Sequence, residues 1–465
     1  MKMPYRLKDG VYLVEGASRG AILDTNSGLV YSINGTACQI VNYRLENDAY
    51  WKRLAQMGTA ETCVSPNTST IQPLKDTERL RFVWFEVVTD DCNERCEHCY
   101  VDSMPRTYRK NIGLVETIFP VLNEQPERKK LTHKDWLRVM KEAYELGCRS
   151  AQLIGGEPFL YKGEKGETVL DLAQYLVELG FTDVEIYTNA TLLTSQKVAR
   201  IKKLGLSIAV SLYSSDPLVH DLVTRTPGSH AKTMRGIHWL KEAGIPLRVE
   251  TVLMKINQGT IAETIELKDS LQVRGRNPDP LRPRGRGDNP LLQPDFAQLV
   301  RYGLMLKPNF SAEAETVSHF YSRHPCLLGK IVITEFGDVL PCIFSRDNVV
   351  GNVLVAPNLE NVLRGPELTR IWRAIKDGVM VCRDCEYRYV CFDCRPLSEG
   401  ASAGNAGYFD APYPRCTYNP YTGEWGQGLW KVNDAGQPVY DRHAAAEIQE
   451  VATTMAYSAN ASAAH

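Results

Sequence analysis

The sequence predicts an α/β protein built around a parallel sheet that is either open or curled into a barrel. Two observations support this prediction. Between residues 80 and 290, short apolar segments alternate with segments of helical character. Four of the helical segments end in a glycine, which relieves the left-handed conformation that closes a helix, and a strand candidate follows each time.

The composition is that of an ordinary soluble protein, with 43% hydrophobic and 23% charged residues and a formal net charge of −1. This balance indicates no general attraction to nucleic acid or to an anionic membrane. No apolar run approaches the length that spans a bilayer, and the N-terminal residues lack the apolar core of a signal peptide. We therefore expect a cytoplasmic protein without nucleic-acid or membrane partners. At 465 residues, the chain is long enough for two to four domains.

Residues 1–75 form the first predicted domain. A strand candidate at 11–16 precedes a hairpin pattern at 21–34, which turns around the sequence NSG. The stretch directly after the hairpin has an apolar stripe that suits a helix. The stretch 58–75 has the composition of a linker.

The second predicted domain, residues 76–310, contains the repeated strand and helix pattern. Its strand candidates are 82–88, 150–156, 184–189, 207–213 and 246–254. Strands that alternate with helices pair in parallel, and the ligand site of such a sheet lies at the carboxyl ends of the strands. Cysteines follow the first strand candidate directly, at that end.

Three cysteines lie close together in the stretch CNERCEHC, namely Cys92, Cys96 and Cys99. The chain has thirteen cysteines, an odd number for a disulfide framework, and clustered thiols in a reducing compartment indicate metal ligands. A zinc site needs four ligands, and the nearest fourth candidate, His98, is awkwardly placed beside Cys99. Three thiolates on a tight loop suit a cubane iron–sulfur cluster, which leaves one iron without a protein ligand.

The stretch CNERCEHCY resembles the cluster loop of radical S-adenosylmethionine (SAM) enzymes, and GGEP at Gly155–Pro158 matches their methionine-binding motif. The second motif lies at the end of the second strand candidate, where the family has it. The resemblance implies a partial (β/α)6 barrel, a 4Fe-4S cluster on the three cysteines, and SAM bound to the open iron. One electron from that cluster would cleave SAM to a 5′-deoxyadenosyl radical, which abstracts hydrogen from a C–H bond in a solvent-free barrel.

The resemblance also assigns residues to SAM. Those expected to contact it are Gly155, Gly156, Glu157, Pro158, His98, Asn189, Ser211 and Arg225. Glu157 and the flanking glycines would hold the SAM ammonium, while Asn189 and Ser211 lie at strand ends where the family contacts ribose and carboxylate. The alternative for Asn189 and Ser211 is ordinary strand-end polarity. Arg225 stands one residue after the position where relatives often carry arginine, which here is Thr224.

A third predicted domain, residues 311–420, is rich in cysteine, and a tail follows at 421–465. The cysteines of this domain are Cys326, Cys342, Cys382, Cys385, Cys391, Cys394 and Cys416. Their spacing resembles the SPASM extension of radical SAM peptide-modifying enzymes, which carries two auxiliary iron–sulfur clusters. It departs from the family pattern in the gap before Cys394, which is one residue shorter, and in the longer reach to Cys416. By itself, the CRDC…CFDC part also fits a zinc ribbon.

The family pattern assigns one auxiliary cluster to Cys382, Cys385, Cys391 and Cys416. It assigns the other to Cys326, Cys342 and Cys394. Phe320 stands where some relatives add a fourth ligand to the second set. Seven cysteines cannot fill eight positions, so one auxiliary cluster has an open iron or a non-cysteine ligand. With the cluster on the first loop, the resemblance implies three 4Fe-4S clusters.

The N-terminal domain resembles, more loosely, the PqqD-like peptide-recognition domain of many maturases, which is winged-helix-like. A small sheet with an open edge can bind an extended leader peptide as an added strand. The alternative is a capping or dimerisation module that binds no peptide.

A run of arginines comprises Arg274, Arg276, Arg282, Arg284 and Arg286. Alone it fits contact with phosphate or RNA. The near-zero net charge argues against nucleic acid, and RP.GRG also recurs near the sixth strand of SPASM relatives. We therefore interpret the run as barrel-end structure that can contact SAM or an acidic peptide.

Together these motifs resemble the radical SAM/SPASM maturases of ribosomally made peptides. The resemblance implies an oxidoreductase that crosslinks a precursor peptide through a thioether or a carbon–carbon bond, with flavodoxin or ferredoxin as electron donor. The auxiliary clusters would accept or relay the electron left after hydrogen abstraction. Peptide epimerisation, or the same machinery acting on a protein or small molecule, as in dehydrogenase or sulfatase maturases, remains an alternative. Sulfatase maturation is disfavoured because Ile343 replaces the aspartate of those relatives, and an electron carrier without enzymatic activity leaves GGEP unexplained.

Overall fold

A computed structural model describes residues 4–65, 69–75, 78–108, 128–275, 277–305, 310–402, 407 and 409–442. The chain divides into two compact units. Unit 1 comprises Met1–Thr77, Leu299–Leu328 and Arg370–His465, and unit 2 comprises Glu78–Gln298 and Gly329–Thr369. Each unit thus joins segments that are far apart in the sequence, and the cysteine-rich stretch contributes to both.

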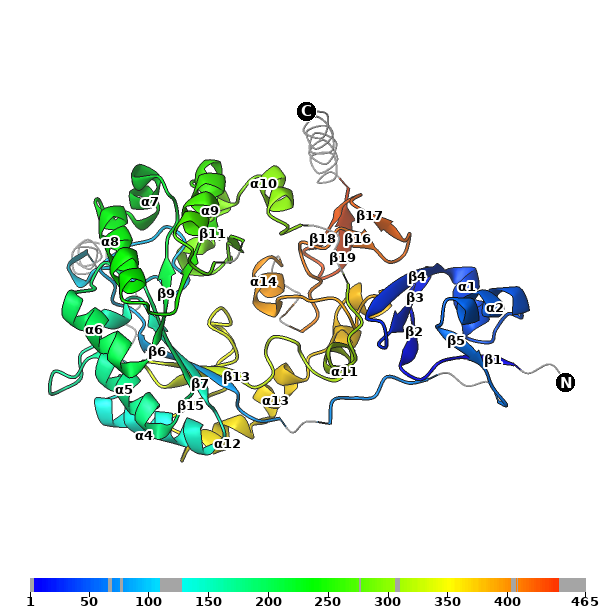
Figure 1. Ribbon diagram of the computed structural model, residues 1–465, viewed down its shortest axis with the longest axis horizontal. Helices are drawn as coiled ribbons and strands as arrows, with labels where there is room; N and C mark the ends of the chain where they lie inside the picture. The colour runs from blue at the N-terminus through cyan, green and yellow to red at the C-terminus, as the bar shows by residue number, and fades with distance from the viewer. Residues whose placement is uncertain are drawn as a thin grey trace. The chain divides into compact units, whose positions relative to one another are not determined.

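Unit 2 is built on an eight-stranded sheet in the order β10-β9-β8-β7-β6-β13-β14-β15 (Figure 1). Its parallel strands are β6 (Phe82–Val88), β7 (Ser150–Gly155), β8 (Asp183–Thr188), β9 (Ser207–Ser211), β10 (Leu247–Glu250) and β13 (Lys330–Thr334). Two antiparallel strands, β14 (Asp338–Leu340) and β15 (Gly351–Asn352), complete the sheet. The predicted parallel sheet and its five strand candidates are confirmed.

The structure differs from the prediction where the fifth strand candidate ends. β10 stops at Glu250, and the following β11 (Val252–Leu253) pairs instead with β12 (Asp279–Pro280). Thr251 lies between the two strands, where its hydroxyl donates to the carbonyl oxygen of Leu212 at 2.7 Å. Proline has no N–H group to extend a ladder. The separate pair of β11 and β12 is therefore only two residues long in each strand.

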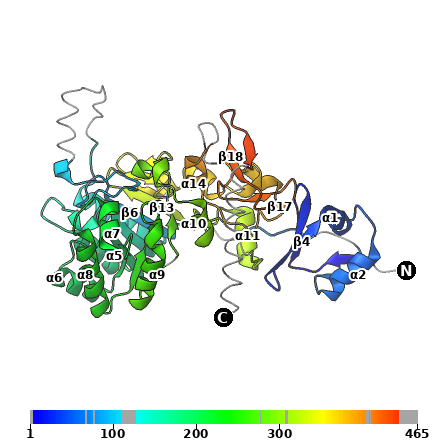
Figure 2. The ribbon, with the colours of Figure 1, turned by 90° about the horizontal axis from the view of Figure 1, so that it is seen from above.

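Helices connect the strands of unit 2, and α5 to α9 lie together on one side of the sheet (Figure 2). They are α4 (His133–Glu145), α5 (Val169–Leu179), α6 (Ser195–Leu204), α7 (Pro217–Thr224), α8 (Ser229–Glu242) and α9 (Ile261–Ser270). Gly180 and Gly205 cap α5 and α6 in the left-handed region, with φ of 101° and 67°. Glycines with positive φ also follow α4 and α8, at Gly147 and Gly244. The predicted glycine stops are confirmed.

Short helical segments occupy the remaining connections. Those of unit 2 are η1 (Pro158–Leu160), η2 (Gln258–Thr260), η3 (Gly285–Gly287), η4 (Pro290–Leu292) and α12 (Leu359–Leu363). Helices α10 (Phe296–Arg301) and α13 (Pro366–Trp372) lie at the boundaries of the two units. Two of these segments belong to the surroundings of the candidate site. η1 directly follows Glu157, and η3 contacts the loop that carries Cys96 and Cys99.

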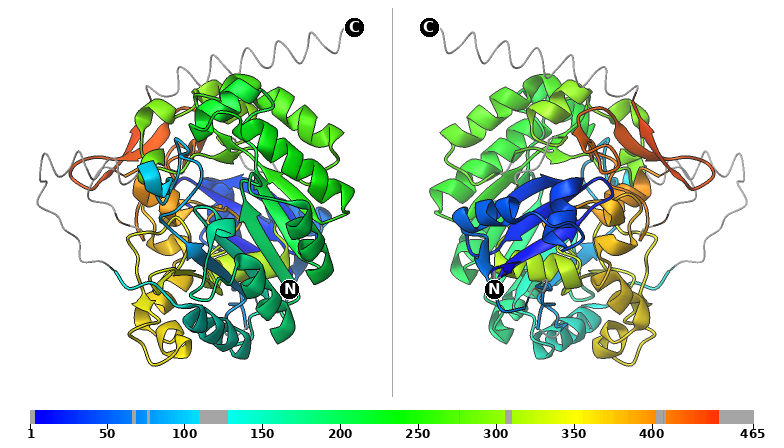
Figure 3. Two further views of the ribbon diagram at one scale, coloured as in Figure 1. Left: turned by 90° about the vertical axis from the view of Figure 1, so that its left-hand side faces the viewer. Right: turned by 90° about the vertical axis from the view of Figure 1, so that its right-hand side faces the viewer.

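The core of unit 2 lies between the sheet and the helices (Figure 3). Phe85, Leu153 and Ile186 come from three neighbouring strands and are fully buried. Phe85 meets Trp136 of α4 in a T-shaped contact with 6.1 Å between ring centroids. Strand side chains alternate between the two faces of a sheet, so the side chains on one face pack against the helices. The other face and the carboxyl ends of the strands remain for the polar groups of the site.

The N-terminal module of unit 1 is a small antiparallel sheet with two helices. Its elements are β1 (Tyr5–Leu7), β2 (Val11–Glu15), β3 (Arg19–Asp24), β4 (Leu29–Asn34), α1 (Gly35–Val41), α2 (Asp48–Gln56) and β5 (Ala60–Thr62). The predicted strand, hairpin and helix are confirmed, with the sheet order β2-β3-β4. The stretch with linker composition instead begins with a strand, because β5 pairs with β1.

The rest of unit 1 packs directly on this small sheet. Val14, Ala21 and Leu23 of the sheet share a hydrophobic core with Val317 and Tyr418. The other elements are α11 (Ala314–Ser322), η5 (Lys376–Gly378), η6 (Cys382–Asp384), α14 (Arg395–Gly400), β16 (Tyr418–Asn419), β17 (Glu424–Trp425), β18 (Leu429–Val432) and β19 (Pro438–Asp441). The first part of the predicted tail thus contains strands, whereas its small-residue end at 456–465 lies outside the described residues. No helix in the described part of the chain is long and apolar enough to cross a membrane.

Candidate cofactor site and metal centres

The cluster loop, residues 92–99, follows β6 at the carboxyl end of the parallel strands. Arg95 and Glu97 donate their backbone N–H groups to carbonyl oxygens at the end of α7, at 3.0 and 2.9 Å. The backbone N–H of Cys99 donates to the carbonyl oxygen of Cys96 at 3.3 Å, which closes a turn. The three thiols are therefore presented from one short loop that is bonded to a neighbouring helix.

A second segment, η3, holds the same loop. Arg286 donates from Nε to the carbonyl oxygen of Cys96 at 2.8 Å and from Nη2 to that of Ser103 at 2.7 Å. Its backbone N–H donates to the carbonyl oxygen of Cys99 at 3.0 Å. A Cβ on Gly285 would lie only 2.5 Å from the same Cys99 oxygen. The sequence analysis did not predict that Arg286 holds the cluster loop. The available signal was its position between two glycines, which allow the backbone of η3 to approach the loop closely.

The other arginines of the run have separate contacts. Arg282 stacks over Phe344 at 5.0 Å from the ring centroid, and Arg284 forms an ion pair with Asp347. Arg276 lies outside the described residues. These contacts are all made with groups of unit 2.

Gly155 and Gly156 lie where the end of β7 crosses the segment that enters the cluster loop. A Cβ on Gly155, which has φ of 146°, would lie 1.8 Å from the carbonyl oxygen of Val88. A Cβ on Gly156 would lie 2.1 Å from the carbonyl oxygen of Asp91. Only glycine fits either position, because real Cβ atoms do not approach other heavy atoms this closely. The two glycines thus keep the cluster loop against the strand ends.

Glu157 is completely buried beside these glycines and is bonded to neighbouring strand ends. Its carboxylate accepts from the Thr188 hydroxyl at 2.7 Å, from the Asn189 backbone N–H at 2.9 Å and from the Phe159 backbone N–H at 3.1 Å. Burial raises the pKa of Glu157, and these hydrogen bonds oppose the shift. Glu157 also caps η1, which begins at Pro158. Glu157 of the GGEP motif therefore holds the end of β8 in place through these hydrogen bonds. This is in addition to its predicted contact with the SAM ammonium.

The side chain of Asn189 reaches back to the cluster loop. Its Nδ2 donates to Oδ1 of Asn93 at 3.0 Å, and its Oδ1 accepts from the backbone N–H of Thr191 at 3.0 Å. Asn93 in turn donates to the Thr191 hydroxyl at 2.7 Å. The structure thus brings Asn189, the GGEP segment and the cluster loop together, as three parts of one polar surface.

His98 contacts Tyr213 just beyond the end of β9, whose last residue is Ser211. The ring centroids of His98 and Tyr213 lie 4.6 Å apart in an edge contact. Burial lowers the pKa of His98 to about 4, so its ring is neutral at physiological pH. Its Nδ1 is buried without a hydrogen-bond partner among the described groups. Such an orphaned polar atom at the predicted cofactor site fits a ligand that supplies the missing bond.

Arg225, the candidate for the SAM carboxylate, is bonded to the cluster loop in this arrangement. It ends α7 with φ of 50°, and its guanidinium forms two hydrogen bonds with Glu97, one of them 2.7 Å long. The structure therefore places Arg225 next to the loop, with its charge paired to that of a loop carboxylate.

The chemistry of the three loop thiols fits a metal cluster. Burial raises the pKa values of Cys92 and Cys96 well above the ordinary value, so their thiolates need a compensating positive charge. Three thiolates on one short loop fit an iron–sulfur cluster, which takes each thiolate on a different iron.

Unit 1 brings together the four cysteines predicted for one auxiliary cluster. Burial raises the pKa of Cys382 to about 11, and among its neighbours Cys391 adds to the shift. Burial also raises the pKa values of Cys385 and Cys416, and Cys391 again contributes to both shifts. All four residues belong to unit 1, and Cys391 contributes to the pKa shifts of the other three.

The other predicted set is divided between the units. Cys326 and Cys394 belong to unit 1, whereas Cys342 belongs to unit 2. Phe320, at the position where some relatives have a fourth ligand, packs at the edge of the unit 1 core. The ligand assignment of this second auxiliary cluster stays a prediction.

The comparisons with known proteins match both cysteine regions. The model of the radical SAM superfamily matches residues 87–267, and that of the SPASM iron–sulfur cluster-binding domain matches residues 326–386. An AdoMet-dependent heme synthase of Methanosarcina barkeri is 24% identical over 374 residues, covering 74% of this chain and 98% of the relative. A PqqA peptide cyclase of Rhodopseudomonas palustris is 25% identical over 315 residues, covering 63% of this chain and 80% of the relative.

Among solved structures, Streptococcus suis SuiB bound to the precursor peptide SuiA aligns with a TM-score of 0.50. The alignment covers 84% of this chain and 96% of that one, at 15% sequence identity. At this level of identity the likeness concerns the fold.

Proposed function

The chain is a radical SAM protein with a SPASM iron–sulfur domain, and from this premise we propose that it oxidatively modifies a ribosomally made precursor peptide. The observation that carries the proposal is a groove of about 310 Å³ beside the β2 edge, in a chain that also has the cluster loop and the GGEP cradle. The relatives include a protein named as a peptide cyclase, and the aligned SuiB structure holds a precursor peptide. The proposed modification is a thioether or carbon–carbon crosslink.

When bound, the first cluster and SAM supply a 5′-deoxyadenosyl radical that abstracts hydrogen from the substrate. The residues of this chain prepare the place for that reaction. Gly155 and Gly156 let the backbone before the cluster loop pack against the strand end, while Glu157 would offer its buried carboxylate to the SAM ammonium. His98, neutral and buried, offers an acceptor or donor nitrogen to the same ligand. Arg286 keeps the loop carbonyl groups in place, so that the three thiols retain their spacing.

We place the leader peptide at the β2 edge of the N-terminal module. Gly16 donates its backbone N–H to the Arg19 carbonyl oxygen. In an antiparallel pair every second residue bonds to the partner strand, so the backbone groups of the even-numbered residues of β2 point toward β3. The N–H and C=O of Leu13 therefore point away from the sheet, and within the described residues they have no backbone partner. They face a groove of about 310 Å³ that is lined by Leu13, Glu15, Ile71 and Tyr389, among others. An extended peptide can add a strand at such an edge, with its side chains in the groove.

The auxiliary clusters suit a net oxidation, because removal of a hydrogen atom leaves an electron that must be accepted. Peptide epimerisation is the alternative within the same machinery, since it uses hydrogen abstraction without net oxidation. A flavodoxin or ferredoxin is the proposed electron donor to the first cluster. A cytoplasmic location belongs to the same proposal, because the cysteine ligands must stay reduced to bind iron.

A small-molecule substrate is the second candidate. The heme synthase of Methanosarcina barkeri is covered over 98% of its length by this chain, which favours this reading. The two candidates differ in what triggers SAM cleavage. A peptide enzyme should cleave SAM faster with its precursor peptide, and an enzyme for small molecules should not respond to that peptide.

The test is high-resolution mass spectrometry of the short peptide encoded beside the gene, after anaerobic co-expression with this protein. A mass lower by two hydrogens, with fragmentation blocked between two residues, is the expected result and identifies the bond. An unchanged mass with deuterium incorporated from deuterated solvent would replace crosslinking by epimerisation. An unmodified peptide in both experiments would overturn the proposal.

The matched control replaces Cys92, Cys96 and Cys99 with alanine. This variant should form no 5′-deoxyadenosine and leave the peptide unmodified, while it retains the iron bound elsewhere. SAM cleavage by this variant would contradict the assignment of the first cluster to these residues.

A further inference from the structure

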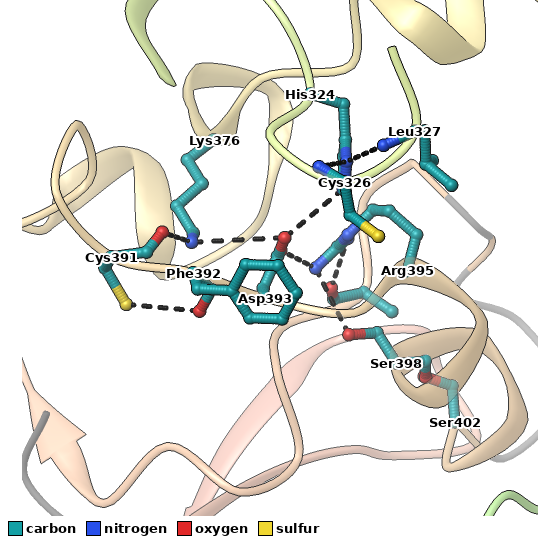
Figure 4. A network of polar contacts seen from close by, with 11 residues as sticks. His324, Cys326, Leu327, Lys376, Cys391, Phe392, Asp393, Arg395, Ser398 and Ser402 are labelled. Atoms are coloured by element: carbon teal, nitrogen blue, oxygen red, sulfur yellow. Dashed lines mark hydrogen bonds and ion pairs between the residues drawn. The ribbon is translucent and has the colours of Figure 1, made fainter. Parts of the chain in front are cut away.

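A buried polar network in unit 1 includes Cys391, one of the four cysteines predicted for an auxiliary cluster (Figure 4). Its centre is Asp393, which is only 2% exposed. Asp393 accepts a hydrogen bond from Nη2 of Arg395, and its Oδ1 lies 3.4 Å from Nε2 of His324 and 4.0 Å from Nζ of Lys376. One carboxylate is thus shared by two cations and an imidazole.

His324 adds no charge to this network. Its Nδ1 accepts the backbone N–H groups of Cys326 at 3.1 Å and Leu327 at 3.2 Å, so this nitrogen carries no proton. The remaining proton lies on Nε2, which faces Asp393. His324 therefore joins the Cys326 loop to Asp393 as a neutral group.

Of the two cations beside Asp393, Lys376 lies farther from the carboxylate than Arg395 does. Its ammonium donates to the backbone carbonyl oxygen of Cys391, and the nearest carboxylate oxygen is the one at 4.0 Å on Asp393, which already binds Arg395. The side chain of Lys376 is only 9% exposed, so water gives it little compensation. A buried cation of this kind needs negative charge nearby. The negative groups that favour its charged form are Asp393 and the thiols of Cys391 and Cys382.

The space beside the network is too small for a further ligand. The cavity lined by His324, Lys376, Cys391, Asp393 and Arg395 has a volume of about 10 Å³. That volume accommodates at most one water molecule. The cavity therefore has no room for a bound anion beside Lys376.

We propose that Lys376 is the buried counter-charge of the auxiliary cluster on Cys382, Cys385, Cys391 and Cys416, and that it raises the reduction potential of that cluster. Reduction adds one electron to the cluster, and a fixed positive charge in a site of low dielectric stabilises the more negative form. The electron comes from the substrate radical of the proposed function and passes to an external carrier, and no bond to Lys376 forms or breaks. The inference rests on the predicted ligand set of this cluster, and the source of the electron rests on the proposed function.

The test is a redox titration followed by electron paramagnetic resonance, in full-length reconstituted protein that lacks the first cluster through the alanine replacements at Cys92, Cys96 and Cys99. Lys376→Met keeps the length of the side chain and removes its charge. The midpoint potential of one cluster should shift to a lower value, while the iron content per chain is unchanged. Lys376→Arg, which keeps the charge, should stay near the wild-type potential.

The matched control is Arg383→Gln. Arg383 also neighbours Cys382 in the sequence, but its side chain is 58% exposed and pairs with Asp384 at 3.8 Å. Solvent screens such a charge, so this variant should leave the potential unchanged.

An unchanged midpoint potential in Lys376→Met, with full iron content, would overturn the inference. Should Lys376→Met lose iron, Lys376→Gln provides a second neutral variant. Loss of iron in both, with retention in Lys376→Arg, would also overturn the inference, because the charge would then act on cluster assembly. Cys382→Ala separates the two proposals, because persistence of every cluster signal in that variant would contradict the ligand set itself.

Discussion

At the scale of single residues, the site depends on positions where no side chain fits. Gly156 donates its backbone N–H to the Val88 carbonyl oxygen at 2.6 Å, and a Cβ there would also lie 2.7 Å from the Ser103 hydroxyl. The backbone of Asp91, just before the cluster loop, fills the space on one side of Gly156, and backbone cannot move aside as a flexible side chain can. The glycines of GGEP therefore act as spacers between two parts of the site.

Gly156→Ala should lower SAM affinity by about fivefold or more, because the loop must shift at a cost of about 1–3 kcal/mol. The measurement is equilibrium SAM binding to the reconstituted protein, with iron content as a second readout. Gly259→Ala is the control, since a Cβ at that position meets no atom within 4 Å. Wild-type SAM binding by Gly156→Ala would show that the crowding seen at this glycine has no functional consequence.

His220 is a buried neutral histidine next to the site. Its Nδ1 accepts the backbone N–H of Tyr213 at 3.2 Å, and its ring lies 5.4 Å from that of His230. Burial, and to a lesser degree His230, lowers the pKa of His220 to about 4, against the opposing effect of Asp221. The unfolded chain therefore binds a proton here at a higher pH than the folded chain does.

Stability should accordingly fall as the pH falls below the ordinary histidine pKa. From about pH 7.5 to about pH 5.5, His220 alone should cost about 1.4 kcal/mol. His220→Asn, whose Oδ1 can accept the same N–H group, should lose less stability over this range than wild type. Urea unfolding under anaerobic conditions at both pH values measures the difference. Equal losses in the two proteins would contradict the depressed pKa.

At the scale of elements, the N-terminal module is part of a larger core. One face of its sheet carries Val14 and Leu23, which pack with Tyr387 and Tyr418. Deletion of residues 1–75 would expose this apolar face, so such a deletion cannot separate peptide recognition from stability. Point changes in the groove at the β2 edge make a cleaner test.

Thr70→Trp should fill that groove without removing a core contact, because Thr70 lines it and is exposed. We expect the affinity for the leader peptide to fall by at least about tenfold, since the added ring occupies the space of the incoming strand. SAM cleavage without peptide should not change. Fluorescence anisotropy of a labelled leader measures the effect, and Val64→Trp, at a side chain that is 93% exposed, is the control. Undiminished affinity would place the leader elsewhere.

At the scale of the whole molecule, two cysteine sets belong to different units. Unit 2 contains the three thiols of the cluster loop, and unit 1 contains the four of one auxiliary cluster. Each set lies within a unit that has its own core. Loss of one cluster should therefore leave the other assembled.

Joint replacement of Cys382 and Cys385 with alanine should remove about four iron atoms per chain, the content of one cubane. Formation of 5′-deoxyadenosine from SAM without peptide should persist, whereas peptide modification should stop because no acceptor takes the electron. Iron analysis and product chromatography measure the two effects. Loss of all iron would show that the two units do not assemble their clusters independently.

Much of the fold followed from local patterns. The strand candidates of the parallel sheet and the glycine stops were visible because short apolar segments and left-handed caps depend on neighbouring residues alone. The spacing of the cysteines and the GGEP motif likewise indicated the cofactor chemistry, because each motif is a short run of fixed residue types. β5 was missed, since a three-residue strand with linker composition exists only through its pairing with β1.

The sequence by itself determined the class of sheet, the cluster loop and the family resemblance, because these depend on residue types at short fixed spacings. Only the tertiary structure decided which distant groups meet. Arg286 donates to the carbonyl oxygen of Cys96, which lies far away in the sequence. Lys376 lies near Asp393 because the chain between them folds back on itself. Such contacts depend on the three-dimensional path of the chain. The spacing of residues along the sequence does not show which distant side chains meet.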